Sequence, residues 1–227
     1  MIRLVVFDMA GTTVDEDNVV YKTLRLAINE IGYDFSLDQV LDQGAGKEKL
    51  QAIKSILKTY AKVEDDKISD LIYQKFIIYL SQAYKDLKVL PQPNTVDLFR
   101  VLKQKKIYVV LNTGYNQETA DDLIRKMNWT KGVEFDELVT ASEVPRNRPD
   151  PDMIFLAMKK TRIHDPKEVV KVGDSKIDIE EGKNAGCRLT IGITTGAHTL
   201  QQLQSAEPDY IINNLLELIP IIEKTNV

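Results

Sequence analysis

The stretch that decides the fold of this chain is Val5–Thr13, which reads Val-Val-Phe-Asp-Met-Ala-Gly-Thr-Thr. The apolar run at 2–7 predicts a buried strand, and this strand delivers one carboxylate, Asp8, to its end. A small residue and the turn-forming pair Gly11-Thr12 follow. An aspartate in this position suits a nucleophile that attacks phosphorus.

Position 10 departs from what phosphate chemistry ordinarily requires. A second acid two residues after the nucleophile would protonate the departing oxygen, and Ala10 cannot do so. The same nine residues therefore predict an activity and lack part of the machinery that usually accompanies it.

The composition is that of an ordinary globular protein, with 227 residues, 43% hydrophobic and 28% charged. A net charge of −4 favours neither nucleic acid nor an anionic membrane as a partner. The single cysteine, Cys187, excludes an intrachain disulfide. No stretch approaches the roughly 18 apolar residues of a membrane span, and no signal peptide pattern opens the chain, so the expected location is the cytoplasm.

Short apolar runs alternate with helical patterns along most of the chain. This alternation predicts parallel strands joined by crossover helices, which is a doubly wound, Rossmann-like α/β domain. The expected strands lie at 2–7, 107–111, 137–140, 169–172, 189–193 and 210–212. The expected helices lie at 94–105, 116–128, 151–161, 177–185, 199–205 and 213–224.

Residues 15–90 interrupt this alternation with successive helical patterns, at roughly 17–31, 36–43, 47–60 and 65–86. An all-helical insert after the first strand predicts a cap domain over the active site. We therefore expect an α/β core domain of residues 1–14 and 91–227 and a helical cap domain of residues 15–90. Hinges are expected at 14–17 and at 90–93, where two prolines disfavour a continuing helix. A single packed domain is the alternative.

Three polar residues follow expected strand ends, namely Asp8, Thr113 and Asp174. In doubly wound sheets the ligand lies at the carboxyl ends of the strands. Asp178 comes one helical turn after Asp174, so three carboxylates are expected to converge, and each would raise the pKa of the others. An Mg²⁺ ion, which takes oxygen ligands, would relieve this repulsion. Helix capping by Asp174 and Asp178 is the alternative.

Two segments suit a phosphoryl group. The Thr113 hydroxyl and the amides of Gly114 and Tyr115 can donate to phosphoryl oxygens at a helix start. Arg148 lies in a proline-rich turn and can neutralise Asp8 and the transferring group. A helix cap for Thr113 and a solvated surface position for Arg148 are the alternatives.

In this order the segments resemble the haloacid dehalogenase-like superfamily. They are Asp8–Val14, Asn112–Gly114, Arg148–Pro151 and Gly173–Asp178, and the insert resembles the helical cap of subfamily I. The resemblance implies that Asp8 is the nucleophile and that Thr113 and Arg148 contact the phosphoryl group. It implies that Mg²⁺ is bound by Asp8, the main-chain carbonyl of Ala10, Asp174 and Asp178. Substrate contacts are expected from Thr12, Gly114 and Tyr115.

Ala10 narrows the resemblance to one branch. Most phosphatases of the superfamily have Asp at this position, whereas the branch with Ala is phosphonoacetaldehyde hydrolase (phosphonatase), which cleaves a C–P bond. The chain resembles this branch further in Asp8–Asp15, Thr113–Tyr115, Arg148-Pro149 and Asp178–Gly186.

Phosphonatase uses a cap lysine that forms an imine with the substrate aldehyde, so that cleavage leaves an enamine. Such a lysine must be partly neutral. Lys49, three residues past Gly46, has the spacing of that lysine, and Lys47 is the alternative. The branch has a histidine three residues after its lysine, where this chain has Ala52. An ordinary solvated helix lysine is the other interpretation of Lys49.

These observations predict an Mg²⁺-dependent hydrolase that forms an aspartyl-phosphate on Asp8 from a small phosphonate or phosphorylated metabolite. The alternative is a phosphomonoester phosphatase, of the phosphoglycolate or sugar-phosphate type, without the usual second Asp. A non-catalytic binding protein of the same fold is a third hypothesis, and a 2-haloacid dehalogenase, which needs no metal site, is the weakest. The expected partner is the small substrate, with no nucleic acid and no membrane, and a homodimer is left open.

Overall fold

The computed structural model describes residues 1–226, apart from the Asp86 side chain. Its main sheet has six parallel strands in the order β5-β4-β1-β6-β7-β8. Their bounds are β1 (Leu4–Asp8), β4 (Tyr108–Thr113), β5 (Glu137–Thr140), β6 (Val169–Gly173), β7 (Leu189–Ile193) and β8 (Tyr210–Ile212). The doubly wound, Rossmann-like fold class is confirmed, with β1 in the middle of the sheet.

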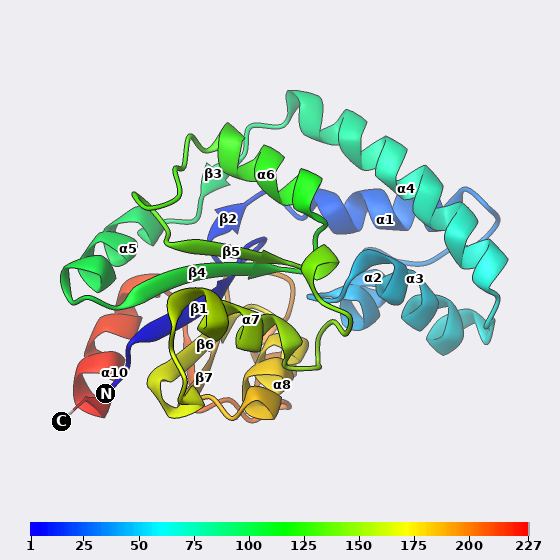
Figure 1. Ribbon diagram of the computed structural model, residues 1–227. Helices are drawn as coiled ribbons and strands as arrows, with labels where there is room; N and C mark the ends of the chain where they lie inside the picture. The colour runs from blue at the N-terminus through cyan, green and yellow to red at the C-terminus, as the bar shows by residue number, and fades with distance from the viewer. Residues whose placement is uncertain (227) are drawn as a thin grey trace.

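Helices cover both faces of this sheet, which is why its strands are apolar on both sides. Val5 and Phe7 of β1 pack into the larger core, and Leu4 and Val6 pack into a smaller core on the opposite face. Figure 1 shows α5 and α6 on one side of the sheet and α7 and α8 on the other. The bounds are α5 (Thr95–Gln104), α6 (Gln117–Lys126), α7 (Asp152–Thr161), α8 (Lys176–Ala185), α9 (Leu200–Gln204) and α10 (Leu218–Thr225).

The first four helices of the chain, which come after β1, gather at one end of the sheet, away from the two termini (Figure 1). They are α1 (Val19–Asn29), α2 (Leu37–Gly44), α3 (Lys49–Ile56) and α4 (Asp66–Asp86), and a π-helical turn at Leu57–Ala61 extends α3. Ser36 and Gln39 form a capping box at the start of α2, and the Asp65 side chain caps α4. Within residues 1–226, no helix is both long enough and apolar enough to cross a membrane.

The two connections between these helices and the sheet run side by side. β2 (Val14–Asp15) pairs antiparallel with β3 (Leu90–Pro91), and the Gln92 amide donates to the Thr13 carbonyl at 2.9 Å. Sequence analysis missed this pairing, because a two-residue strand is too short to show a periodic pattern. We propose that the cap of residues 15–90 and the core of residues 1–14 and 91–227 meet at this ribbon.

Candidate active site

Asp8 ends the central strand and is 5% exposed. In the tight turn that follows, the Met9 carbonyl accepts hydrogen bonds from three successive amides, those of residues 12–14. Gly11 in this turn has φ +84°, and a Cβ there would lie 2.3 Å from the Asp174 carboxylate. Only glycine therefore allows the turn to approach Asp174 so closely.

The structure brings together the three carboxylates that the sequence suggested would converge. One oxygen each from Asp8, Asp174 and Asp178 lie within 4.8 Å of one another, and all three residues are buried. Asp174 accepts from the Ala197 amide at 2.6 Å and from the Thr12 hydroxyl at 3.5 Å. The N-cap residue of α8 is Ser175, whose hydroxyl donates to Asp178 at 2.5 Å, so Asp174 is not the N-cap of that helix.

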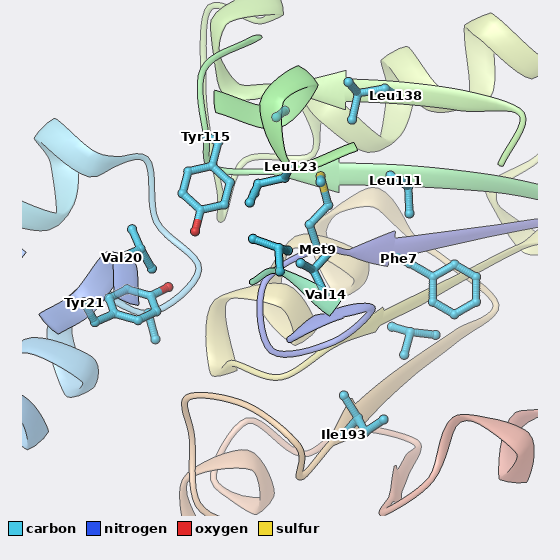
Figure 2. Packing of buried hydrophobic residues seen from close by; sticks show 14 of the residues in the cluster. Phe7, Met9, Val14, Val20, Tyr21, Leu111, Tyr115, Leu123, Leu138 and Ile193 are labelled. Atoms are coloured by element: carbon cyan, nitrogen blue, oxygen red, sulfur yellow. The ribbon is translucent and has the colours of Figure 1, made fainter. Parts of the chain in front are cut away.

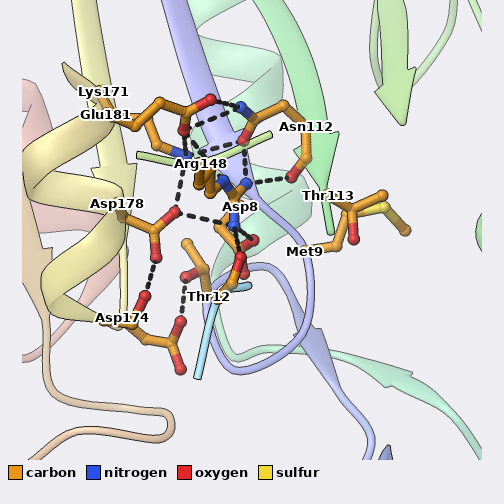
Figure 3. A network of polar contacts seen from close by, with 12 residues as sticks. Asp8, Met9, Thr12, Asn112, Thr113, Arg148, Lys171, Asp174, Asp178 and Glu181 are labelled. Atoms are coloured by element: carbon orange, nitrogen blue, oxygen red, sulfur yellow. Dashed lines mark hydrogen bonds and ion pairs between the residues drawn. The ribbon is translucent and has the colours of Figure 1, made fainter. Parts of the chain in front are cut away.

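Arg148 is fully buried and connects these acids to the strand next to β1 (Figure 3). Its guanidinium donates to Asp8 Oδ1 at 2.8 Å, to Glu181 Oε2 at 3.0 Å, and to the Asn112 carbonyl at 3.0 Å. It also lies 3.2 Å from Asp178 Oδ1. The solvated surface position is therefore wrong for Arg148, which pairs with Asp8 as the sequence suggested.

Sequence reasoning missed two members of this network. The Lys171 ammonium lies 2.7 Å from Asn112 Oδ1, 2.8 Å from Asp178 Oδ1 and 3.2 Å from Glu181 Oε2, and every one of these side chains is buried. The available signal was the position of Lys171 inside the otherwise apolar strand β6, because lysine is rarely buried without a partner. Glu181 follows Asp178 by three residues, which places both on one face of α8.

The network carries more negative than positive charge. Its buried acids are Asp8, Asp174, Asp178 and Glu181, whereas its buried cations are Arg148 and Lys171. Burial raises the pKa of Asp8 and of Asp174, and the neighbouring carboxylates raise both further. Burial also acts against ionisation of Asp178, but Arg148 and Lys171 hold its pKa below the ordinary value. Full ionisation leaves an excess of two negative charges, which fits one divalent cation with oxygen ligands.

The expected substrate contacts lie around this cluster. Thr113 is buried at the end of β4 and its hydroxyl accepts from the Tyr115 amide at 3.2 Å, which leaves its own hydrogen free for another acceptor. The Thr12 hydroxyl, expected to contact substrate, donates its hydrogen to Asp174. Ala10 makes an isolated β-bridge with Val14 and brings no acid to the site.

The loop before α3 closes over the cluster. The Gly46 carbonyl accepts from Arg148 at 3.1 Å, and the Gln51 side chain donates to the Arg148 carbonyl at 3.2 Å. A Cβ on Gly114 would lie 2.7 Å from the Lys47 carbonyl oxygen, and one on Gly46 would lie 2.4 Å from the Ser175 hydroxyl. The inserted segment therefore contacts the core directly, at Arg148, Gly114 and Ser175 beside the carboxylates.

Lys49 lies inside this contact. It is 6% exposed, its ammonium donates to the Lys47 carbonyl at 2.7 Å, and the ring centres of Tyr21 and Tyr115 lie 5.5 and 5.0 Å away. Figure 2 shows the Tyr115 ring near the end of β4 and the Tyr21 ring on α1, with Val20 drawn between them. Burial lowers the pKa of Lys49 to about 8, against the opposing charges of Glu48 and Asp8. The solvated helix lysine is thus wrong.

The sheet is parallel, and a buried aspartate lies at the end of its central strand with an arginine and further acids around it. This arrangement is that of the class of hydrolases with an α/β fold to which the sequence showed a resemblance. Residues 5–191 match the family model described as haloacid dehalogenase-like hydrolase. The chain belongs to this family, so the resemblance seen in the sequence is confirmed.

Individual relatives agree with this assignment. The chain is 29% identical over 257 residues to a phosphonoacetaldehyde hydrolase from Latilactobacillus sakei, with 98% of this chain and 96% of the relative covered. It is 25% identical over 224 residues to phosphoglycolate phosphatase 1 from Pseudomonas aeruginosa, with 98% and 80% covered. A phosphonoacetaldehyde hydrolase-like protein from Oleispira antarctica has the same fold, with a TM-score of 0.85, 20% identity, and 99% and 92% covered.

Proposed function

We propose that this protein is an Mg²⁺-dependent hydrolase of the phosphonatase type. It acts on a small phosphonate, or on a closely related phosphorylated metabolite, through an aspartyl-phosphate on Asp8. The observation that carries the proposal is Lys49, a buried amine with a pKa of about 8 beside a site whose position 10 is alanine. The similarity to relatives named phosphonoacetaldehyde hydrolase supports it.

Asp8 is the proposed nucleophile because Arg148 orients it. The guanidinium holds Asp8 Oδ1 at 2.8 Å and opposes the effect of burial on ionisation of this carboxyl group. The carboxylate attacks phosphorus, the bond from phosphorus to the leaving group breaks, and water later releases phosphate from Asp8. The free hydroxyl hydrogen of Thr113 and the charge of Arg148 bind the phosphoryl oxygens.

The carboxylates fit an Mg²⁺ ion, which Asp8, Asp174, Asp178 and the main-chain carbonyl of Ala10 would hold. When bound, Mg²⁺ reduces the repulsion between the Asp8 carboxylate and the anionic phosphoryl group. Arg148 and Lys171 keep Asp178 ionised for this purpose, since they hold its pKa below the ordinary value.

Lys49 supplies what a carbon leaving group needs. Its neutral amine adds to the aldehyde of the substrate and forms an imine, and cleavage of the C–P bond then leaves its electrons in an enamine instead of a free carbanion. Because no oxygen anion departs in this route, the acid missing at Ala10 is not required for the cleavage step.

Lys49 should be labelled when the protein is incubated with phosphonoacetaldehyde and borohydride, because borohydride reduces an imine to a stable amine. Peptide mass spectrometry locates the label. Lys49→Met should lose it, whereas Lys47→Met should keep it, since the Lys47 ammonium donates instead to Ser55 at 3.1 Å. An unlabelled wild-type protein that rapidly hydrolyses phosphate monoesters would exclude the imine route.

Mg²⁺ should raise the melting temperature of metal-free wild-type protein, because it neutralises the two excess charges of the network. A concentration of about 100 Kd corresponds to about 2.7 kcal/mol of stabilisation. Differential scanning fluorimetry should show a much smaller effect in Asp174→Asn and an unchanged one in Asp122→Asn, a surface carboxylate paired with Arg125. Equal shifts in all three proteins, or turnover that a chelator leaves intact, would remove the metal from the proposal.

A phosphomonoester phosphatase of the phosphoglycolate or sugar-phosphate type is the second candidate. Ala52 favours it, because this residue is fully buried where the phosphonatase resemblance implies a histidine. The relative named phosphoglycolate phosphatase 1 points the same way. Comparison of turnover on phosphonoacetaldehyde and on a panel of phosphate monoesters decides between the two.

A further inference from the structure

A buried carboxyl group, Glu16, has no part in the proposed cleavage but stabilises the charge of Lys49. Glu16 follows β2 and is 3% exposed. Its Oε2 accepts from the Val20 amide at 3.1 Å and from the Tyr84 hydroxyl at 3.1 Å. The Tyr84 hydroxyl in turn lies 3.0 Å from that of Tyr115. A continuous hydrogen-bonded chain therefore runs from Glu16 through Tyr84 of α4 to Tyr115, the second residue after β4.

The last residue of this hydrogen-bonded chain lies beside the lysine. The ring of Tyr115, whose hydroxyl closes the chain, is the one that lies 5.0 Å from the Lys49 ammonium. The two tyrosines remain neutral, because burial raises the pKa of each well above its ordinary value. A neutral phenol that accepts one proton and releases another can pass a proton along such a chain.

Glu16 and Lys49 also affect each other's ionisation. Burial raises the pKa of Glu16 to about 7 and lowers that of Lys49 to about 8, and each charge stabilises the other. Glu16 and Lys49 therefore ionise over neighbouring pH ranges, and a change in the charge of one shifts the pKa of the other. The other charged or titratable groups that act on this pair are Lys22, Tyr21, Tyr84 and Tyr115 around Glu16, and Glu48, Asp8 and Arg148 around Lys49.

We propose that Glu16 is the proton donor for imine formation at Lys49, acting through Tyr84 and Tyr115. It would supply the acid that this chain lacks at Ala52, where the resemblance implies a histidine. The inference rests on the proposed function and adds to it a residue that sequence reasoning did not find.

The protons and charges balance. The neutral Lys49 nitrogen bonds to the aldehyde carbon, the carbonyl π electrons move to oxygen, and a proton of the amine follows them, which gives a neutral carbinolamine. Glu16 then releases a proton through the two phenols to the carbinolamine hydroxyl, which leaves as water while the nitrogen lone pair forms the C=N bond. The products are a positive iminium at Lys49 and a negative Glu16 carboxylate, whose charges offset each other in the buried site.

Glu16→Gln tests the role of the proton, because glutamine can still accept from the Val20 amide. Glu30→Gln is a matched control, since Glu30 accepts from Tyr79 of the same helix α4 at 2.5 Å but lies at the surface. With phosphonoacetaldehyde and borohydride, labelling of Lys49 in Glu16→Gln should be about 100-fold slower than in wild type, and that in Glu30→Gln should be unchanged. Tyr84→Phe should slow labelling and Tyr79→Phe should not.

The pH profile separates this role from a structural one. In wild type the labelling rate should pass through a maximum between about pH 7 and 8, because the pair must hold one of its two protons. In Glu16→Gln only the rise with pH should remain, since Lys49 must still be neutral, and it should occur at lower pH because the stabilising carboxylate is gone. Identical rates and profiles in wild type and Glu16→Gln would overturn the inference.

A second measurement needs no substrate. The infrared band that is present in wild type and absent in Glu16→Gln reports the protonation of Glu16. It should titrate near pH 7, and in Lys49→Met it should titrate at higher pH, because the lysine charge lowers the pKa of Glu16. An unmoved titration would overturn the coupling of the two groups. Wild-type protein that shows no label at Lys49 would instead overturn the imine route itself, and this inference with it.

Discussion

Replacement of Asp8 by asparagine should lower turnover by at least about 10³-fold, because the amide cannot form the aspartyl-phosphate. Initial rates with phosphonoacetaldehyde and with phosphate monoesters measure the effect, so the result does not depend on which bond is cleaved. Asp15→Asn is the matched control, since Asp15 lies just after the same turn and is exposed. Its rate should remain that of the wild type.

The fold of Asp8→Asn should survive. Burial and the neighbouring carboxylates raise the pKa of Asp8, so its charge is disfavoured in the folded state and a neutral side chain does not add to the repulsion. Circular dichroism and the melting temperature check this. Full activity in a folded Asp8→Asn protein would overturn the nucleophile assignment, and with it the aspartyl-phosphate.

Replacement of Lys171 by methionine should lower the free energy of unfolding by about 3–5 kcal/mol. The lysine has no exposed surface, and its ammonium is within 3.2 Å of both Asp178 and Glu181. Methionine fills a similar volume but leaves the network with one cation against four acids. Removing one partner of a buried ionic network costs much more than removing a surface pair, because the remaining charges stay desolvated.

Urea denaturation of metal-free protein measures this change. Lys167 is an exposed lysine just before β6, the strand that contains Lys171. Its replacement in Lys167→Met should change the unfolding free energy by less than about 0.5 kcal/mol. If Lys171→Met were as stable as Lys167→Met, the Lys171 ammonium would not stabilise the folded state through the buried network.

The elements of the core were predictable because their signals are local. Each expected strand lies within about two residues of the observed one, since a short apolar run with a polar stop identifies a buried parallel strand by itself. The same logic placed Asp8, Thr113 and Asp174 at strand ends. The ribbon of β2 and β3 was not predictable, because its two-residue strands exist only through their pairing with each other.

The site was predictable only in part. The proline-rich turn around Arg148 led to the prediction that this residue acts on Asp8, but nothing in that turn shows that the side chain is buried against Asp8. Lys171 is visible in the sequence as an anomaly, but its partner Glu181 is defined only by the packing of α8 on the sheet. Glu16 carries no local pattern, because it stands in a run of acids beside the first connection.

The sequence by itself determined the parallel sheet, the helical insert and the arrival of Asp8 and Asp174 at one edge, since strand period and strand ends are properties of neighbouring residues. Only the tertiary structure decided the state of Lys49. Its lowered pKa comes from burial between Tyr21 and Tyr115, and the charge of Glu16 acts on it through space. These residues lie tens of positions apart in the chain, and desolvation and charge interactions depend on distance in space.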